Sequence, residues 1–344
     1  MMKKRLVGTA ACVGILTCFT FLASAHADVA EFYRGKTIPL VVGYPATSGY
    51  SIYARSLARH LGHHIPGQPV VIMQNMPGAA SLSAANWIYN VGARDGSVIG
   101  MFSTAAAIDG LFGNSQAKFD ARKFTWIGNM DQSIGTCAVW HTSNVKTFDD
   151  ALNKEVLFGA TGPAAGITQG ALALKNLFGA KIRLAKGYGG GAEIVLAMER
   201  EEVQGQCAMP LSLLKTSLAD KVRAGQIIPI IHDGLKPVAS LPGVPSVYDY
   251  AKTDEDRQVL DLVFGWHELG RPVAAPPDLP RDRMDSLRTA FMATMADSEF
   301  VAEAKKMDLD ISPLPGDQVA VLIQRFFGYS QSVVDRAADA VREK

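Results

Sequence analysis

The chain has 344 residues, enough for a large hydrophobic core and for two lobes or domains. Hydrophobic residues make up 48% and charged residues 19%, as in a typical globular protein, and the formal net charge is +1. A nucleic-acid surface needs a clustered basic face, and nothing in this balance of charges points to one.

The N-terminus carries the most specific local signal. A basic start at residues 3–5 precedes an uncharged apolar stretch over 6–23, which ends in a small-x-small cleavage pattern. This pattern predicts a secretory signal peptide cleaved between Ala27 and Asp28, because the segment is barely long enough for a retained membrane anchor. Its removal leaves 31 basic and 33 acidic residues, a charge near −2. We therefore expect a mature protein that is soluble and lies in the periplasm.

A strand, a small-residue loop and a helix follow in the mature chain. The β-branched run 38–42 predicts a buried strand, and residues 46–51 form a loop of small and polar residues. Apolar residues then recur at helical spacing, at Ala54, Leu57, Ala58 and Leu61. Such a loop leaves backbone N–H groups unpaired at a helix start, which suits an anion. The alternative is an ordinary connection between a strand and a helix without a ligand.

Strand and helix patterns alternate over much of the chain, which favours a parallel sheet covered on both faces. Extended segments are expected at residues 69–74, 98–102, 124–129, 136–140, 155–159, 182–185, 203–207, 227–231 and 263–269. Helices are expected from residue 82, after the cap pattern at 147–150, at 169–178 and at 192–200. Residues 274–280 are predicted as a stiff proline-rich linker, and residues 281–344 as helical with a break at 312–316.

Two further loops repeat the first arrangement. Loop two, residues 159–168, follows a predicted strand and precedes a helix, and loop three, residues 187–191, does the same. Neither the first loop nor loop two contains Lys or Arg, so an anion there would be held by backbone dipoles and hydroxyl groups.

Motifs for common enzyme chemistries are absent from the sequence. The three loops lack the phosphate-loop and dinucleotide patterns, and no Gly-x-Ser-x-Gly elbow occurs. His60 and His64 share a helix face and could pair on a metal, but solvated histidines are the commoner explanation. We therefore expect no catalytic residue, no metal site and no cofactor. Cys137 and Cys207 either form one disulfide or remain two buried thiols, and the sequence leaves both open.

An ordered set of motifs resembles the extracytoplasmic solute receptors of tripartite tricarboxylate transporters, the Bug/TctC family. The segments that carry the resemblance run along nearly the whole mature chain, at residues 45–55, 70–80, 95–96, 187–192, 241–245 and 271–280. The first of them differs from the family pattern, since Thr47 and Ser48 replace glycines and Ser51 replaces a frequent Asp. In loop two, Pro163 removes one N–H donor and Ala165 replaces a frequent Ser.

The resemblance implies an α/β fold of the two-lobed, type II periplasmic binding protein kind, with a ligand cleft between lobes. It implies a first lobe from residues 28–135 and 251–344 and a second lobe from 136–250. It also implies that residues 46–51 and 161–168 clasp a carboxylate. The candidate ligand-binding residues are Tyr44, Thr47, Ser48, Gly49, Tyr50, Ser51, Thr161, Gly162, Ala164, Ala165, Thr168 and Met209.

The resulting expectation is a periplasmic receptor that captures a small organic acid and docks on integral-membrane permease subunits, with no nucleic-acid partner. Because loop one lacks a carboxylate, we expect an acidic or neutral group at the far end of the solute. Two alternatives stay open: a receptor that presents its ligand to a sensor protein, and a secreted enzyme that uses the loops as an oxyanion site.

Overall fold

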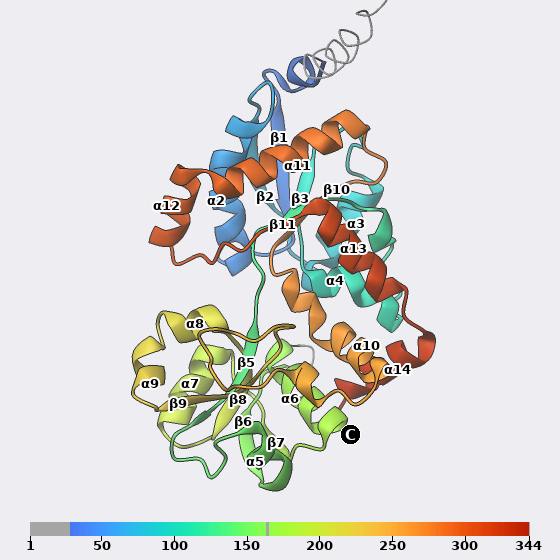
Figure 1. Ribbon diagram of the computed structural model, residues 1–344. Helices are drawn as coiled ribbons and strands as arrows, with labels where there is room; N and C mark the ends of the chain where they lie inside the picture. The colour runs from blue at the N-terminus through green and yellow to red at the C-terminus, as the bar shows by residue number, and fades with distance from the viewer. Residues whose placement is uncertain (1–27, 163–164, 344) are drawn as a thin grey trace, which may run out of the picture.

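The computed structural model describes residues 28–162 and 165–343. The predicted signal peptide, including Ala27, lies outside the described residues. The chain forms two bodies, each centred on its own β-sheet (Figure 1). We call the six-stranded sheet and its helices the first lobe, and the five-stranded sheet and its helices the second lobe. Within the described residues, no helix combines the length and apolarity needed to cross a membrane.

The first lobe is built on a sheet with the strand order β11-β4-β10-β3-β1-β2. Its strands are β1 (Thr37–Val42), β2 (Val70–Asn75), β3 (Ile99–Met101), β4 (Thr125–Asn129), β10 (Pro272–Ala275) and β11 (Leu314–Pro315). Strand β1 pairs in parallel with β2 and β3, whereas β10 lies antiparallel between β3 and β4. The β-branched run at β1 forms a strand because its apolar side chains, Ile38, Leu40 and Val42 among them, are fully buried.

The second lobe is built on a sheet with the strand order β7-β6-β8-β5-β9. Its strands are β5 (Gly135–Trp140), β6 (Val156–Gly159), β7 (Ile182–Ala185), β8 (Gly205–Pro210) and β9 (Ile227–His232). Strand β6 pairs in parallel with β7 and β8, and β5 runs antiparallel to both β8 and β9.

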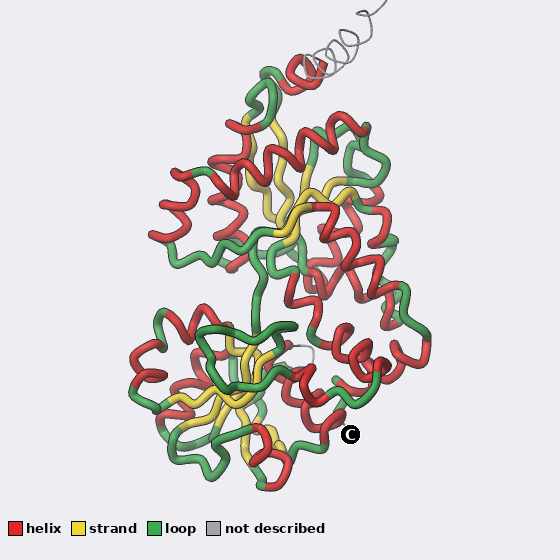
Figure 2. Tube along the Cα trace, in the orientation of Figure 1, coloured by secondary structure: helices red, strands yellow, loops and turns green. Residues whose placement is uncertain are grey.

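Helices pack against both sheets (Figure 2). The α-helices are α2 (Gly49–His64), α3 (Leu82–Asn90), α4 (Thr104–Ile108), α5 (Phe148–Asn153), α6 (Gly166–Phe178), α7 (Gly191–Glu199), α8 (Leu211–Lys215), α9 (Ala219–Arg223), α10 (Asp254–Val263), α11 (Arg281–Ala296), α12 (Ser298–Lys306), α13 (Gly316–Phe327) and α14 (Gln331–Ala340). The 3-10 helices are η1 (Ala79–Ser81), η2 (Asp109–Phe112), η3 (Ala121–Lys123), η4 (Val247–Tyr250) and η5 (Gly265–Glu268). Helix α14 packs on α10 and on α6, so the C-terminal part of the chain contacts the second lobe.

Most predicted elements are confirmed, and three expectations need correction. Both sheets are mixed rather than parallel, because β5, β10 and β11 run antiparallel to their neighbours. The segment 263–269, expected to be extended, is the end of α10 and η5; a buried apolar run does not distinguish strand from helix by itself. Ala274 and Ala275, assigned to the linker, complete β10, and the prolines that follow end that strand.

The strand directions decide which loops face the segment between the lobes. Strands β1, β3 and β4 point the same way, and residues 130–134 lead from the end of β4 to the start of β5. In the second sheet, β6 and β8 end on the edge where β5 begins. The loops that follow β1 and β6 therefore both lie at the sheet edges nearest the connecting segment (Figure 1). The exact lobe boundaries given above stay a prediction.

Candidate functional site

Loop one is held in place by side chains that bond to its own backbone. Ser48 caps α2 by accepting a hydrogen bond from the Ser51 N–H at 3.2 Å, and the Ser51 hydroxyl donates to the Pro45 carbonyl at 2.9 Å. The Asn75 side-chain amide donates to the Ser51 hydroxyl and to the Tyr44 carbonyl, both at 2.7 Å. Ser51 is fully buried. Its hydroxyl therefore shapes the loop and is not free for a solute.

Two tyrosine rings and an arginine pack together at loop one. The rings of Tyr44 and Tyr50 stack, with centroids 4.4 Å apart. The Arg271 guanidinium carbon lies 4.5 Å from the centre of the Tyr50 ring and 4.8 Å from that of Tyr53. Burial raises the pKa of Tyr50 to about 12, although the nearby Arg271 charge acts in the opposite direction. Tyr50 is therefore a neutral hydrogen-bonding group at physiological pH.

The start of α2 is positively polarised, and its own first turn supplies no counter-charge. The first turn of α2 contains no acidic residue, and the first N–H groups, those of Gly49 and Tyr50, have no partner within the helix. A Cβ built on Gly49 would lie 3.5 Å from the Arg271 guanidinium, so a second positive group lies close to this helix start. An anion placed here would meet both.

Loop two is held mainly by its backbone and one hydroxyl. The Thr168 hydroxyl accepts from the Thr161 N–H at 3.1 Å and donates to the Thr161 carbonyl at 3.2 Å. Ala165 provides no side-chain cap for α6, and the first turn of this helix also contains no acidic residue. The Thr161 hydroxyl is buried and makes no hydrogen bond among the described residues. The start of α6 is thus a second helix end open to an anion.

Loop three differs from the other two because the chain supplies its own anion. The carboxylate of Glu193, in the first turn of α7, accepts from the Gly189 N–H at 2.6 Å. An N–H group of loop three is therefore already bonded to a carboxylate of its own helix. Loops one and two remain as the candidate pair for binding an anion.

A cavity of about 300 Å³ lies between the lobes at the connecting segment. It is lined by Asp131, Gln132, Ser133, Ile134, Leu211, Ser212, Lys215, Asp310, Ile311 and Ser312. Asp131 is joined to loop one by the segment that carries Arg271: the Asp131 carbonyl accepts from the Gly270 N–H at 2.9 Å, and the Arg271 guanidinium lies against the Tyr50 ring. Loop one is therefore next to a polar cavity that both lobes line.

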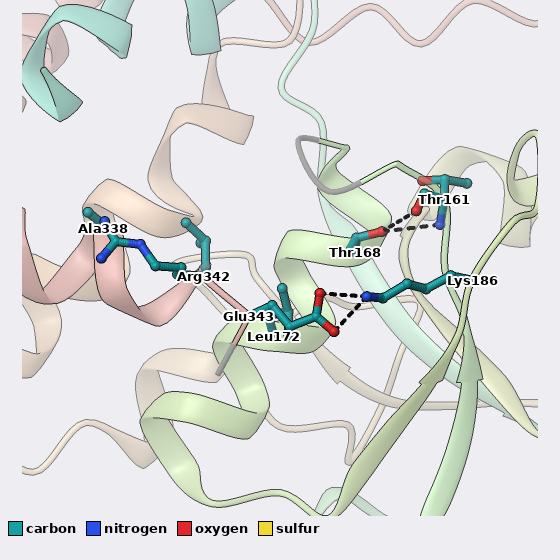
Figure 3. Close-up of a pocket in the computed structure, with 8 residues that line it drawn as sticks. Thr161, Thr168, Leu172, Lys186, Ala338, Arg342 and Glu343 are labelled. Atoms are coloured by element: carbon teal, nitrogen blue, oxygen red, sulfur yellow. Dashed lines mark hydrogen bonds and ion pairs between the residues drawn. The ribbon is translucent and has the colours of Figure 1, made fainter. Parts of the chain in front are cut away.

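A second cavity of about 440 Å³ lies between loop two and the C-terminal segment of the chain. Figure 3 shows Thr161 and Thr168 on one side and Arg342 and Glu343 on the other, with Glu343 paired to Lys186. Neither of the two cavities is lined by a residue of loop one among those described. The structure thus places the two loops on facing edges but does not bring them to one cavity.

The individual predicted residues fall into three groups. On the first-lobe edge lie Tyr44, Thr47, Ser48, Gly49, Tyr50 and Ser51, and on the second-lobe edge lie Thr161, Gly162, Ala165 and Thr168. Ala164 lies outside the described residues. Met209 is 1% exposed and packs in the core of the second lobe, and its carbonyl accepts from the Thr136 hydroxyl at 2.9 Å.

Sequence reasoning missed Asp131 and Arg271. A signal for Asp131 is present, because it follows the buried strand β4 at the sheet edge on which loop one lies. Arg271 precedes β10, whose last two residues were assigned to a linker, so its position beside loop one could not be expected.

The two histidines considered as a metal pair instead contact carboxylates on neighbouring helices. His60 lies 3.1 Å from a Glu303 oxygen and His64 lies 2.9 Å from an Asp297 oxygen. In the described part of the chain, no three His, Cys, Asp or Glu side chains come together as a metal site would require.

The cysteine question left open by the sequence is settled by the structure. Cys137 and Cys207 are joined by a disulfide between β5 and β8. Cys207 also lies under α6, because a Cβ built on Gly170 would be 3.4 Å from the Cys207 Cβ. The cross-link therefore supports the helix whose start forms loop two.

Comparison with known proteins establishes the fold. No family model and no curated protein matches the sequence. A TctC solute binding protein from Polaromonas, solved without ligand, superposes with a TM-score of 0.69 at 16% identity, over 88% of this chain and 99% of that one. An R. palustris protein with adipate gives 0.59 at 17% identity, over 88% and 97%. MatC from Rhodopseudomonas palustris with bound malate gives 0.55 at 16% identity, over 90% and 99%.

These similarities cover nearly all of each neighbour, and at 16–17% identity they show the fold alone. The predicted two-lobed periplasmic binding protein fold is confirmed.

Proposed function

We propose that this protein is an extracytoplasmic solute-binding receptor of the Bug/TctC kind, which captures a small carboxylate between its lobes. The observation that carries this proposal is the pair of helix starts, one in each lobe, that face the connecting segment without an acidic residue in their first turns. Such helix ends bind anions through free N–H groups and the helix dipole. Solved neighbours with adipate and malate support the same class of solute.

The binding mode needs no catalytic group. Each charge-assisted hydrogen bond from a backbone N–H to a carboxylate contributes about 1.5–3 kcal/mol, so a few of them support micromolar binding after ordering costs. Arg271 would add its charge near the first helix start. We infer that the solute is bound and released unchanged, that the protein is not an enzyme, and that the lobes close to bring loops one and two onto the same solute.

The same proposal covers location and partners. We infer that the protein is exported to the periplasm, where it delivers the solute to the membrane subunits of a tripartite tricarboxylate-type permease. One structural neighbour is a TctC solute binding protein, which supports this partner. A sensor protein as the recipient would leave the binding site unchanged, and a pulldown with solute-loaded receptor distinguishes the two recipients.

Native mass spectrometry of the protein taken directly from the periplasm tests the proposal. We expect a mass increment that corresponds to a small organic acid, recovered chemically intact, and an increase in melting temperature when that acid is added back. Absence of any bound acid, together with no response to a panel of carboxylates, would refute the receptor. Turnover of the recovered compound would point to the enzyme alternative instead.

A single substitution that removes one backbone N–H group tests the role of loop one. Gly49→Pro removes the first N–H of α2 while proline is well tolerated at that helix position, and Ser48 already has the extended backbone that precedes a proline. We expect affinity for the acid to fall about tenfold, the equivalent of one hydrogen bond to a charged group. Gln331→Pro is the matched control, because Ser330 caps α14 in the same way on a helix that begins outside loops one and two.

A further inference from the structure

A buried carboxylate that forms no hydrogen bond with the described residues lies where the first sheet ends and the connecting segment begins. Asp131 is 6% exposed. Its backbone carbonyl accepts from the Asn129 side chain at 2.7 Å and from the Gly270 N–H at 2.9 Å, which fixes its position. Its carboxylate makes no hydrogen bond with any described residue. Buried polar groups are nearly always paired, so an unpaired carboxylate at this place requires an explanation.

The carboxylate faces the cavity between the lobes. Asp131 lines this cavity together with Asp310 on the first lobe and with Ser212 and Lys215 on α8 of the second lobe. The Asp131 carboxylate oxygens have no hydrogen-bond partner among the described residues, yet they keep some contact with solvent, unlike the enclosed Thr161 hydroxyl. A ligand in the cavity can therefore reach them.

Arg271 is near Asp131 but does not serve as its partner. Among the described residues, no cation comes within ion-pair distance of the Asp131 carboxylate, and Arg271 instead donates to the Gly270 carbonyl at 2.6 Å. The guanidinium lies against the Tyr50 and Tyr53 rings. Desolvation raises the pKa of Asp131 to about 6 despite the Arg271 charge, and Asp310 adds to the rise. The site thus lacks one positive charge in direct contact with Asp131.

We propose that the solute carries an ammonium group as well as a carboxylate, and that Asp131 binds this ammonium group. The solute class is then the amino acids and related amino-bearing organic acids. In this arrangement the ammonium group lies in the cavity and supplies the missing partner of Asp131. The carboxylate extends from the cavity toward Arg271 and the α2 helix start, which lie beside the cavity and do not line it. On the first-lobe side of the cavity Asp310 adds negative charge, whereas Lys215 lies on α8 of the second lobe. The first-lobe side therefore favours a cationic group over a second carboxylate.

This inference rests on the proposed receptor function and narrows its substrate. It differs from the expectation drawn from loop one alone, that a loop without a carboxylate favours an acidic or neutral group at the far end of the solute. The carboxylate that loop one lacks is provided by Asp131, which lies far from that loop in sequence.

Calorimetric titration with matched solutes tests the inference. The full exported protein is stripped of ligand by unfolding and refolding, then titrated at pH 7.5 with the twenty L-amino acids and with L-lactate, L-malate, L-2-hydroxyglutarate, succinate and adipate. The hydroxy acids replace the ammonium group of alanine, aspartate and glutamate by a hydroxyl group. We expect at least one amino acid to bind about tenfold more tightly than any of these acids, as a charge-assisted pair requires.

The variant Asp131→Asn separates this role from a structural one. It keeps the shape of the side chain and removes its charge, so the affinity for the amino acid should fall about tenfold or more while that for the hydroxy acids changes less than about threefold. Asp308→Asn is the matched control, since Asp308 is exposed and does not line the cavity. Circular dichroism confirms that both variants fold.

The outcomes distinguish the two proposals. Tighter binding of acids without an ammonium group, or an unchanged amino-acid affinity in Asp131→Asn, overturns the inference and leaves the receptor function intact. Binding of neither class removes the receptor function and the inference with it.

Discussion

Loops one and two occupy corresponding places in the two lobes, each before a helix start without an acidic residue, but they are stabilised in different ways. Loop one is fixed by side chains, since Ser48, Ser51 and Asn75 bond to its backbone and to each other. Loop two relies on one hydroxyl, that of Thr168, and on the position of α6 above the Cys137–Cys207 disulfide. The first edge is therefore shaped locally, and the second depends on the packing beneath it.

This difference indicates how each loop should respond to mutation. Local hydrogen bonds each contribute about 1 kcal/mol, so loop one should lose its shape in small steps. Loop two should be disturbed by changes in the core of its lobe. The predictions below separate these two modes, in order of decreasing effect.

The largest effect is expected from the disulfide beneath loop two. The cross-link closes a loop of 70 residues, so the double variant Cys137→Ala/Cys207→Ala should lose about 4 kcal/mol of unfolding free energy in the chain-entropy model. Urea unfolding followed by circular dichroism measures the loss. Reductant should destabilise the native protein by a similar amount and leave the double variant unaffected.

Free thiols in the unreduced protein would contradict this prediction. Thiol alkylation followed by mass measurement detects them. If the comparison between the loops is correct, the double variant should also weaken solute binding, because the start of α6 forms the end of loop two.

The second-largest effect is expected in the first lobe, where a substitution should raise the unfolding free energy and not lower it. Asp131→Asn removes a desolvated charge and should stabilise the solute-free protein at pH 7 by up to about 3 kcal/mol, at 1.36 kcal/mol per pKa unit. The pKa of Asp131 is raised from 3.8 to about 6 on folding. Below pH 3.8 the carboxyl is protonated in both states and does not lower the unfolding free energy, whereas between pH 3.8 and about 6 it lowers the unfolding free energy increasingly as the pH rises. The stability difference between Asp131→Asn and the native protein should therefore disappear at low pH.

Unfolding in urea at pH 3.8 and at pH 7 measures this difference, with Asp308→Asn as the control. Equal stability of Asp131→Asn and the native protein at pH 7 would show that the carboxylate is not desolvated. A gain in stability would show that the first lobe retains a charge at the cost of its own fold, which is common at binding sites.

The sequence predicted those parts of the molecule that depend on local pattern. Strand β1 and helix α2 follow from hydrophobic periodicity, and the cap at Thr147 was recognised because its hydrogen bonds span three residues. The repeated pattern of strand, loop and helix also predicted three loops at helix starts, and only the family resemblance singled out loops one and two as a pair.

The sequence could not predict contacts that depend on how distant segments pair. Strand β10 inserts antiparallel between β3 and β4, and this brings Arg271 beside Tyr50. The disulfide stayed open because the register of β5 against β8 has no local signal. The place of Asp131 after a predicted strand was visible in the sequence, but its burial and its lack of a hydrogen-bond partner among the described residues arise from tertiary packing.

A smaller effect is expected from the one hydroxyl that shapes loop two. Thr168→Val removes the group that both accepts from and donates to the Thr161 backbone. Thr168 is 2% exposed, so the freed groups are partly desolvated and unfolding free energy should fall by about 1–2 kcal/mol. Thr168→Ser retains the hydroxyl and should recover most of the loss. Equal stability of the native protein and Thr168→Val would mean that loop two is held by its backbone alone.

The smallest effect should come from loop one, where several bonds share the same task. Asn75→Ala removes two hydrogen bonds, to Tyr44 and to Ser51, but Asn75 is exposed and Ser51 still bonds to Pro45. We expect a loss of about 1 kcal/mol in unfolding free energy, measured in urea, and a larger relative loss of solute affinity, measured by calorimetry. Gln74→Ala, at the neighbouring exposed position of β2, should change neither. If Asn75→Ala instead lowered stability as much as loss of the disulfide, loop one would depend on its surroundings as loop two does, and the contrast between the two lobes would not hold.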